Sequence, residues 1–337
     1  MRPILLVSLL ALAGCNGDRG GTEHLDEYLD RLSSATGMAL PSPEPFRAAA
    51  SLPQDRPRET LAANGIGLID FLSLSGCELQ INLGRRNTQL GRTASPSQQL
   101  LLDLEFLALA PSCVPMLRAR GDVALADKID RVHLERRQHL PQLIFQAVLQ
   151  GPEWQAFWQP ALALDPYPAD TDSQVITALS MQARLVERWL DGDWLAGADE
   201  FELLLSELRA GDGGTLLFAL QQVRVALERA NKMLTNLPHA APLCPYGHPT
   251  QRSKALQRVV ERFFVANLQP WLTALRRRWE MLKPAIEQLE RPLAGALPQS
   301  YVQWQQQRDA LPEALIRDIR AHVGLMQQAL TPCNATQ

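Results

Sequence analysis

The stretch Phe264–Leu282, FVANLQPWLTALRRRWEML, decides the fold class. Large apolar side chains recur in it every three or four positions, at Phe264, Leu268, Trp271, Leu275, Trp279 and Leu282. This spacing places them on one side of an α-helix, where they can pack against other helices. The stretch therefore predicts a long core helix. Pro270 and Pro284 should bend it, because proline removes a helical hydrogen bond.

The same spacing continues through most of the chain. Two further stripes are Leu216, Leu220, Val223, Leu227, Ala230 and Leu234, and Leu315, Ile319, Val323, Met326 and Leu330. Ser95 followed by Pro96 is a strong helix-start signal. Helices are expected over 23–35, 66–74, 77–86, 96–110, 123–149 with a kink at Pro141, 173–190, 198–210 and 215–234, and from Thr250 onward. Since no useful alternating pattern indicates a strand, we predict an all-α protein, an irregular helical bundle with long kinked helices.

The N-terminus predicts export and lipid attachment. Arg2 precedes an apolar run, Ile4 to Ala13, which has the length of a secretory signal and ends in Leu12-Ala13-Gly14-Cys15. This resembles the bacterial lipobox, which implies cleavage before Cys15 and acylation of that cysteine (palmitate among the acyl groups), so that several acyl chains hold the protein to a membrane. Asn16 stands where an Asp would resemble an inner-membrane retention signal, which favours the periplasmic face of the outer membrane.

The organisation that follows has three parts. Residues 1–14 are the signal peptide, and 15–59 form a lipid-anchored tether, a short amphipathic helix and a proline-rich linker. Residues 60–337 form the helical domain, with a possible internal boundary at the Pro- and Asp-rich segment 159–171. No apolar run after Ala13 approaches the about 18 residues of a membrane span, so no second span is expected.

The cysteines fit an oxidising compartment. Lipidation of Cys15 leaves four of the five cysteines, an even number, and four allow three pairings. We favour Cys77 with Cys113 and Cys244 with Cys333, because each pair would staple neighbouring helices. Loops of these lengths give roughly 4 kcal/mol per disulfide on the chain-entropy model.

Several classes of function are disfavoured. Motifs for serine hydrolases, zincins, nucleotide binding and thioredoxin-like redox chemistry are absent, so no catalytic residue and no cofactor is assigned. A zinc site would need more clustered ligands than the one cysteine and one histidine of Cys244-Pro-Tyr-Gly-His248, so no metal site is predicted. The net charge of −3, together with the periplasmic compartment, excludes nucleic acid as a partner.

Titratable residues inside helices are interpreted as structural. Asp103 shares a helical arc with leucines and should be partly buried with an arginine partner. His322 lies beside an apolar stripe and should be a hydrogen-bonded core or boundary histidine. The segment HLERRQH, 133–139, reads as a solvated charged face.

One candidate contact site remains, the turn GRRNTQLGR at 84–92. Arg86, Asn87 and Arg92 could bind an anion or a partner together with the amino end of the helix that begins at Pro96. The alternative is structural: cations suit the end of the preceding helix, Asn87 can cap it in a left-handed conformation, and the arginines pair inward with Asp103 or Glu105.

Much of the mature chain is similar to a family of Gram-negative lipoproteins whose function is uncharacterised. The likeness is carried by Leu68-Ile69-Asp70-Phe71-Leu72, Gly76-Cys77-Glu78-Leu79-Gln80, Arg86-Asn87, Leu90-Gly91, Pro96-Ser97, Leu104-Glu105-Phe106-Leu107, Cys113, Leu243-Cys244-Pro245 and Gln269-Pro270. The resemblance implies no activity and supplies no catalytic residue.

These observations favour a non-enzymatic binding or scaffold protein of the cell envelope. Its expected partners are the membrane, through the lipid anchor, and an envelope protein or an anionic envelope component. The alternative is an envelope enzyme that acts on cell-wall or lipid substrates. A concave pocket with convergent titratable groups would distinguish the enzyme from the binding protein.

Overall fold

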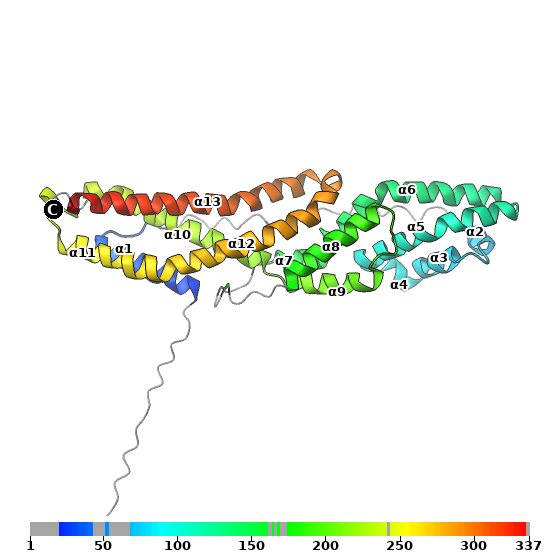
Figure 1. Cartoon of the computed structure of the whole chain (residues 1–337), viewed down its shortest axis with the longest axis horizontal. Helices are drawn as coiled ribbons and strands as arrows, with labels where there is room; N and C mark the ends of the chain where they lie inside the picture. Colours follow the sequence, from blue (N-terminus) through cyan, green and yellow to red (C-terminus); the bar gives the residue numbers. More distant parts are fainter. Residues whose placement is uncertain are drawn as a thin grey trace, which may run out of the picture.

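The computed structural model is helical throughout the residues that it describes, which are 20–42, 51–53, 68–160, 164, 167–168, 174–240 and 243–334 (Figure 1). Its elements are α1 (Gly21–Thr36), α2 (Leu68–Ser73), α3 (Leu79–Asn87), α4 (Gln89–Arg92), α5 (Pro96–Ala119), α6 (Val123–Val148), α7 (Pro152–Phe157), α8 (Gln174–Leu190), α9 (Ala198–Arg209), α10 (Gly213–Ala240), η1 (Pro245–Gly247), α11 (Gln251–Val259), the π-helix η2 (Val260–Leu268), α12 (Gln269–Glu290), η3 (Arg291–Ala296), α13 (Gln299–Leu330) and η4 (Thr331–Asn334). Since no strand occurs in these ranges, the prediction of an all-α fold is confirmed. The signal peptide, Cys15 and most of the proline-rich linker lie outside them.

The helices build an elongated body (Figure 1). At one end α5 and α6 pack side by side, and α3 lies against α5. At the other end α13 packs along α10, while α12 packs along α8 nearer the middle. The apolar stripes predicted for 216–234 and 264–282 are buried as expected. Six of the seven tryptophans are buried as well, namely Trp154, Trp158, Trp189, Trp271, Trp279 and Trp304.

α5 begins where the sequence predicts and ends later. The Ser95 hydroxyl accepts a hydrogen bond from the Gln98 backbone N–H at 3.2 Å, and the Gln98 side chain accepts one from the Ser95 N–H. Packing against α3 and α6 carries the helix past Pro111 and Pro115, both exposed, to Ala119 rather than to about 110. An 18-residue stretch of α5 has a mean hydropathy of 1.7, so by length and composition this helix could span a membrane, and the expectation that no such stretch follows Ala13 was wrong. Half of that stretch is buried inside the protein, as in the core helix of a globular protein.

Both predicted disulfides are present. Cys77 and Cys113 join the start of α3 to α5, with their Cα atoms 5.8 Å apart. Cys244 and Cys333 join the segment before α11 to the segment after α13, with a Cα separation of 5.1 Å. The two disulfides therefore lie at opposite ends of the body.

The described core forms two clusters. The smaller one surrounds the Cys77–Cys113 bridge and includes Phe106 and Ile129. The larger one contains side chains from both sides of 159–171, such as Trp158 and Val175, so core packing continues across that segment. The two clusters meet within α5 and α6 instead, because each of these helices contributes one part of its length to each cluster.

α1 belongs to the larger core. The sequence places this helix ahead of the helical domain, but its apolar face of Leu25, Tyr28, Leu29 and Leu32 is buried as predicted, against α11, η2 and α10. Gly37 ends the helix in a left-handed conformation, φ 65°, and its N–H donates to the Ser33 carbonyl at 2.8 Å. The body therefore begins at residue 21 rather than near residue 60.

Candidate functional site

A long apolar groove runs between α12 and α13, with η2 at one end. It is lined by residues from 260–265 of η2, 269–280 of α12 and 312–330 of α13, with Leu220 of α10 in the floor. We call it the α12–α13 groove. Its volume is about 650 Å³, in the middle of the range typical of small-molecule sites. α12 packs mainly on α8 and α13 mainly on α10, and α12 also contacts α10, which thus lies beneath the space between the two walls.

The groove is long enough for an extended hydrocarbon chain. The wall from residue 312 to residue 330 is about 27 Å long at the rise of an α-helix. The groove is open to solvent along this wall, so an extended chain can lie in it from end to end.

The lining changes in character along the groove. Near η2 it is apolar, with Phe264 and Met326 buried and Val265 half exposed. Three of its charged lining residues, Arg276, Glu280 and Glu313, lie toward η3, and the fourth, Arg320, lies near the middle of the α13 wall. The lining residues include no Ser, Cys or His, so the described groove holds no nucleophile paired with a base.

The π-helix η2 was not foreseen in the sequence. It gives a hydrogen bond from Gln269 N–H to the Phe264 carbonyl, five residues back. Pro270 follows directly and has no N–H to donate, so the series of α-helical hydrogen bonds is interrupted at this point even without the π-helix. Short π-helical segments often occur at functional sites, and this one supplies the apolar end of the groove. Pro270 was the signal that could have indicated it.

A buried polar cluster fixes the helices around this apolar end. The Tyr28 hydroxyl lies 2.5 Å from His322 Nε2, and His322 Nδ1 lies 2.6 Å from Asn231 Oδ1. With Asn231 Oδ1 as acceptor, the imidazole carries its proton on Nδ1 and accepts from Tyr28. Burial lowers the pKa of His322 to about 4, so it is neutral at physiological pH. The predicted hydrogen-bonded core histidine is confirmed, and it ties α1, α10 and α13 together.

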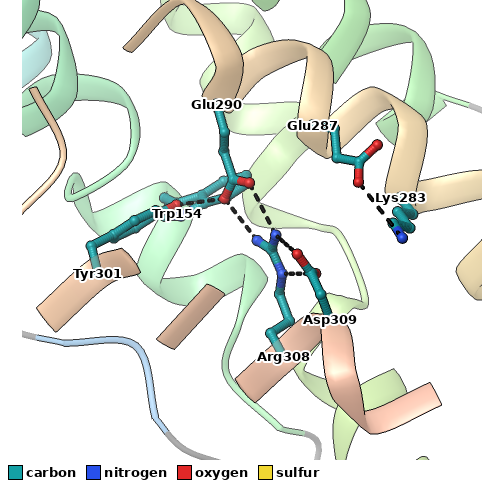
Figure 2. Close-up of polar contacts among 7 residues, drawn as sticks. All are labelled: Trp154, Lys283, Glu287, Glu290, Tyr301, Arg308 and Asp309. Carbon is teal, nitrogen blue, oxygen red and sulfur yellow. Dashed lines mark hydrogen bonds and ion pairs between the residues drawn. The ribbon is translucent and has the colours of Figure 1, made fainter. Parts of the chain in front are cut away.

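A second buried cluster holds the α12–α13 hairpin (Figure 2). Arg308 donates to both carboxylate oxygens of Glu290, at 2.7 and 3.0 Å, and its Nε donates to Asp309 at 2.8 Å. The Tyr301 hydroxyl donates to Glu290 at 2.8 Å and accepts from Trp154 Nε1 at 3.1 Å. Burial opposes the charge on Arg308, but Glu290 and Asp309 together raise its pKa above the usual value. This cluster secures the hairpin from which both groove walls extend.

The arginine turn at 84–92 is largely engaged within the protein. Arg86 Nη1 lies 2.5 Å from the Asp103 carboxylate, and Arg136 Nη1 lies 3.2 Å from the same oxygen. The predicted pairing of a buried Asp103 with arginine is thus confirmed, and Arg86 has the structural role that the sequence left open. Asn87 remains inside α3 and does not adopt the left-handed conformation considered for it. Asn87 and Arg92 are exposed, and a partner contact there stays a prediction.

The HLERRQH segment is only partly a solvated face. Arg136 is buried beneath Phe106, with its guanidinium carbon 3.9 Å from the ring centroid. His133 packs edge-on against Trp194, and burial lowers its pKa. His139 Nδ1 lies 2.7 Å from the Glu135 carbonyl oxygen of its own helix. In the described ranges no three of the residue types His, Cys, Asp and Glu come together to hold a metal ion.

Comparison with known proteins places the chain in a family. Residues 25–337 match the family described as "Protein of unknown function (DUF3080)". The chain belongs to this family. The match begins inside α1, which agrees with the packing of that helix into the DUF3080 body. No curated protein and no solved structure matches the chain.

Proposed function

We propose that this DUF3080 protein is a lipid-anchored binding protein on the periplasmic face of the outer membrane, and that it binds the apolar chain of an envelope amphiphile in the α12–α13 groove. Its role is to hold this ligand rather than to transform it. Its partners are the membrane, through acylated Cys15, and lipid-like components of the envelope.

The proposed location rests on the lipobox at Cys15 and on the disulfides. Four of the five cysteines are joined in two disulfides, a pattern that belongs to an oxidising compartment. The apolar run before Cys15 supports export.

The proposed ligand rests on one observation, the long apolar groove. A groove about 27 Å long suits an extended acyl chain, which can follow it along its whole length. Its side chains near η2 provide apolar burial, which is the main favourable term in binding hydrocarbon. The groove does bring four titratable side chains together, which an enzyme could use. These side chains are exposed, however, and the lining contains no Ser, Cys or His, so we propose binding without turnover.

The test is to fill the groove and measure binding of a fluorescent fatty acid to the purified mature protein. Thr273 lines the groove, is exposed, and donates its hydroxyl proton to the Gln269 carbonyl of its own helix. Thr273→Trp should reduce affinity at least tenfold because the indole occupies the path of the chain. Thr235 is exposed on α10 and makes the equivalent bond to the Asn231 carbonyl, so Thr235→Trp is the matched control.

The expected result is saturable binding by the wild-type protein and by Thr235→Trp, and weak binding by Thr273→Trp. Absence of saturable binding by the wild-type protein would refute the proposal. Equal losses in the two variants would place the fatty acid elsewhere and would refute the groove as its site.

A further inference from the structure

We infer that the α12–α13 groove accepts its ligand in one orientation and prefers a lipid whose head group carries both a phosphate and a primary ammonium. The inference rests on the proposed function and adds the chemistry of the head group. It is carried by the positions and signs of the charged lining residues, together with the polarity of the groove.

The polarity follows from the hairpin. α12 and α13 are joined by η3 and therefore run in opposite directions (Figure 1). Residues late in α12 thus lie across the groove from residues early in α13, which places Glu280 near Glu313 at the η3 end. By the same rule, η2 lies across from the last turns of α13. The groove consequently has a charged end toward η3 and an apolar end toward η2.

The part of the groove from its middle to the η3 end has two charged residues of each sign. Arg276 and Glu280 of α12 and Glu313 of α13 lie toward η3, and Arg320 of α13 lies near the middle. A purely anionic head group would meet two carboxylates, and a purely cationic one would meet two guanidinium groups. A zwitterionic head group satisfies both, since arginine binds phosphate through two parallel hydrogen bonds and carboxylates accept from an ammonium group.

These charges are available to a ligand. Arg276 Nε donates to Glu280 at 2.7 Å, but the two side chains are 63% and 56% exposed. An exposed pair of this kind contributes little to stability, so each partner can exchange the other for a ligand group at small cost. Glu313 and Arg320 are exposed as well.

The apolar end suits a hydrocarbon chain. Val265 and Val323 are incompletely buried there, so a chain that covers them removes apolar surface from water. The acyl chain of the lipid is therefore expected to lie at this end.

Head-group preference is tested with three probes that share one acyl chain: lysophosphatidylethanolamine, lysophosphatidylglycerol and monoacylglycerol. Their dissociation constants are measured with the mature protein by displacement of a fluorescent fatty acid. Lysophosphatidylethanolamine should bind about tenfold more tightly than either of the others, as expected for a gain of one or two charge-assisted hydrogen bonds. Arg320→Gln should remove most of this preference. Arg317→Gln, which removes the same charge from an exposed site on α13 outside the groove lining, should preserve it.

Orientation is tested with lysophosphatidylethanolamine that carries a photoreactive diazirine at the end of its chain. Crosslinks should map to η2 or to 323–330 of α13. Crosslinks to Arg276 or Glu280 would refute the orientation.

The outcomes separate this inference from the proposed function. Equal affinity for all three probes, or preference for lysophosphatidylglycerol, would overturn the head-group inference while acyl-chain binding in the groove remained intact. Failure of every probe to bind would overturn both.

Discussion

Removal of Arg308 should destabilise the protein severely, because it leaves Glu290 as a stranded charge in the core. The Arg308 side chain is 1% exposed and that of Glu290 is 5% exposed, so water cannot replace the missing partner. Loss of one partner from a buried pair costs about 3–5 kcal/mol. Arg308 also packs against the rings of Trp158 and Trp304, at 5.3 and 5.0 Å from their centroids. We therefore expect Arg308→Met to lower the free energy of unfolding by at least about 3 kcal/mol.

Urea denaturation followed by circular dichroism measures this loss. The double variant Glu290→Gln, Arg308→Met removes both charges and should recover much of the stability, which appears as a coupling energy in the double-mutant cycle. The exposed pair Lys283–Glu287, one turn earlier on α12, is the control (Figure 2). Lys283→Met should cost less than about 0.5 kcal/mol.

Two results would refute this reasoning. The first is a loss for Arg308→Met no larger than that for Lys283→Met, which would mean that the core solvates the free carboxylate. The second is a double variant no more stable than Arg308→Met, which would mean that the loss comes from packing against the tryptophans rather than from charge.

Three further predictions follow from burial and sequence. Burial lowers the pKa of His322 from 6.5 to about 4. The free energy of unfolding should therefore be highest above pH 6.5 and fall by about 3 kcal/mol as the pH falls toward 4. In urea titrations, His322→Gln should make this decline smaller. Arg86→Ala should lower the free energy of unfolding by about 2 kcal/mol in the same assay, since a charged hydrogen bond to Asp103 is lost. Arg92 is exposed, so Arg92→Ala should change it by no more than about 0.5 kcal/mol. Equal losses would contradict the structural role of Arg86. Cys15→Ser should abolish incorporation of radiolabelled palmitate in cells, and continued labelling would contradict the lipobox interpretation.

Sequence patterns predicted most of the helices and the covalent frame, but not α7 or the π-helix η2. Apolar spacing located the core faces of α10 and α12, and the order of the cysteines, once Cys15 was set aside, predicted both disulfides. Asp103 was also interpreted correctly, because a carboxylate among leucines needs a cationic partner. Each of these inferences depends on the pattern within one helix or on the number and order of the cysteines.

The groove could not be predicted in this way, because it depends on two helices that pack elsewhere. The stripe of α13 predicts a buried seam along its whole length. In the structure Leu315 and Met326 are buried, whereas Ile319 and Val323 remain half exposed and form part of the groove wall. Periodicity identifies an apolar face but does not tell whether a partner helix covers it.

The run Arg276-Arg277-Arg278 shows the same limit for charge. Successive residues on a helix point about 100° apart, so three identical side chains meet three environments. Arg276 lines the groove, Arg277 is exposed, and Arg278 is buried with two hydrogen bonds to Asp212, at 2.9 and 2.5 Å. Only two of the three charges therefore reach solvent. The environment of each arginine therefore has to be known before a ligand is inferred from a basic run, and in this chain it directs the search from the turn at 84–92 to the groove.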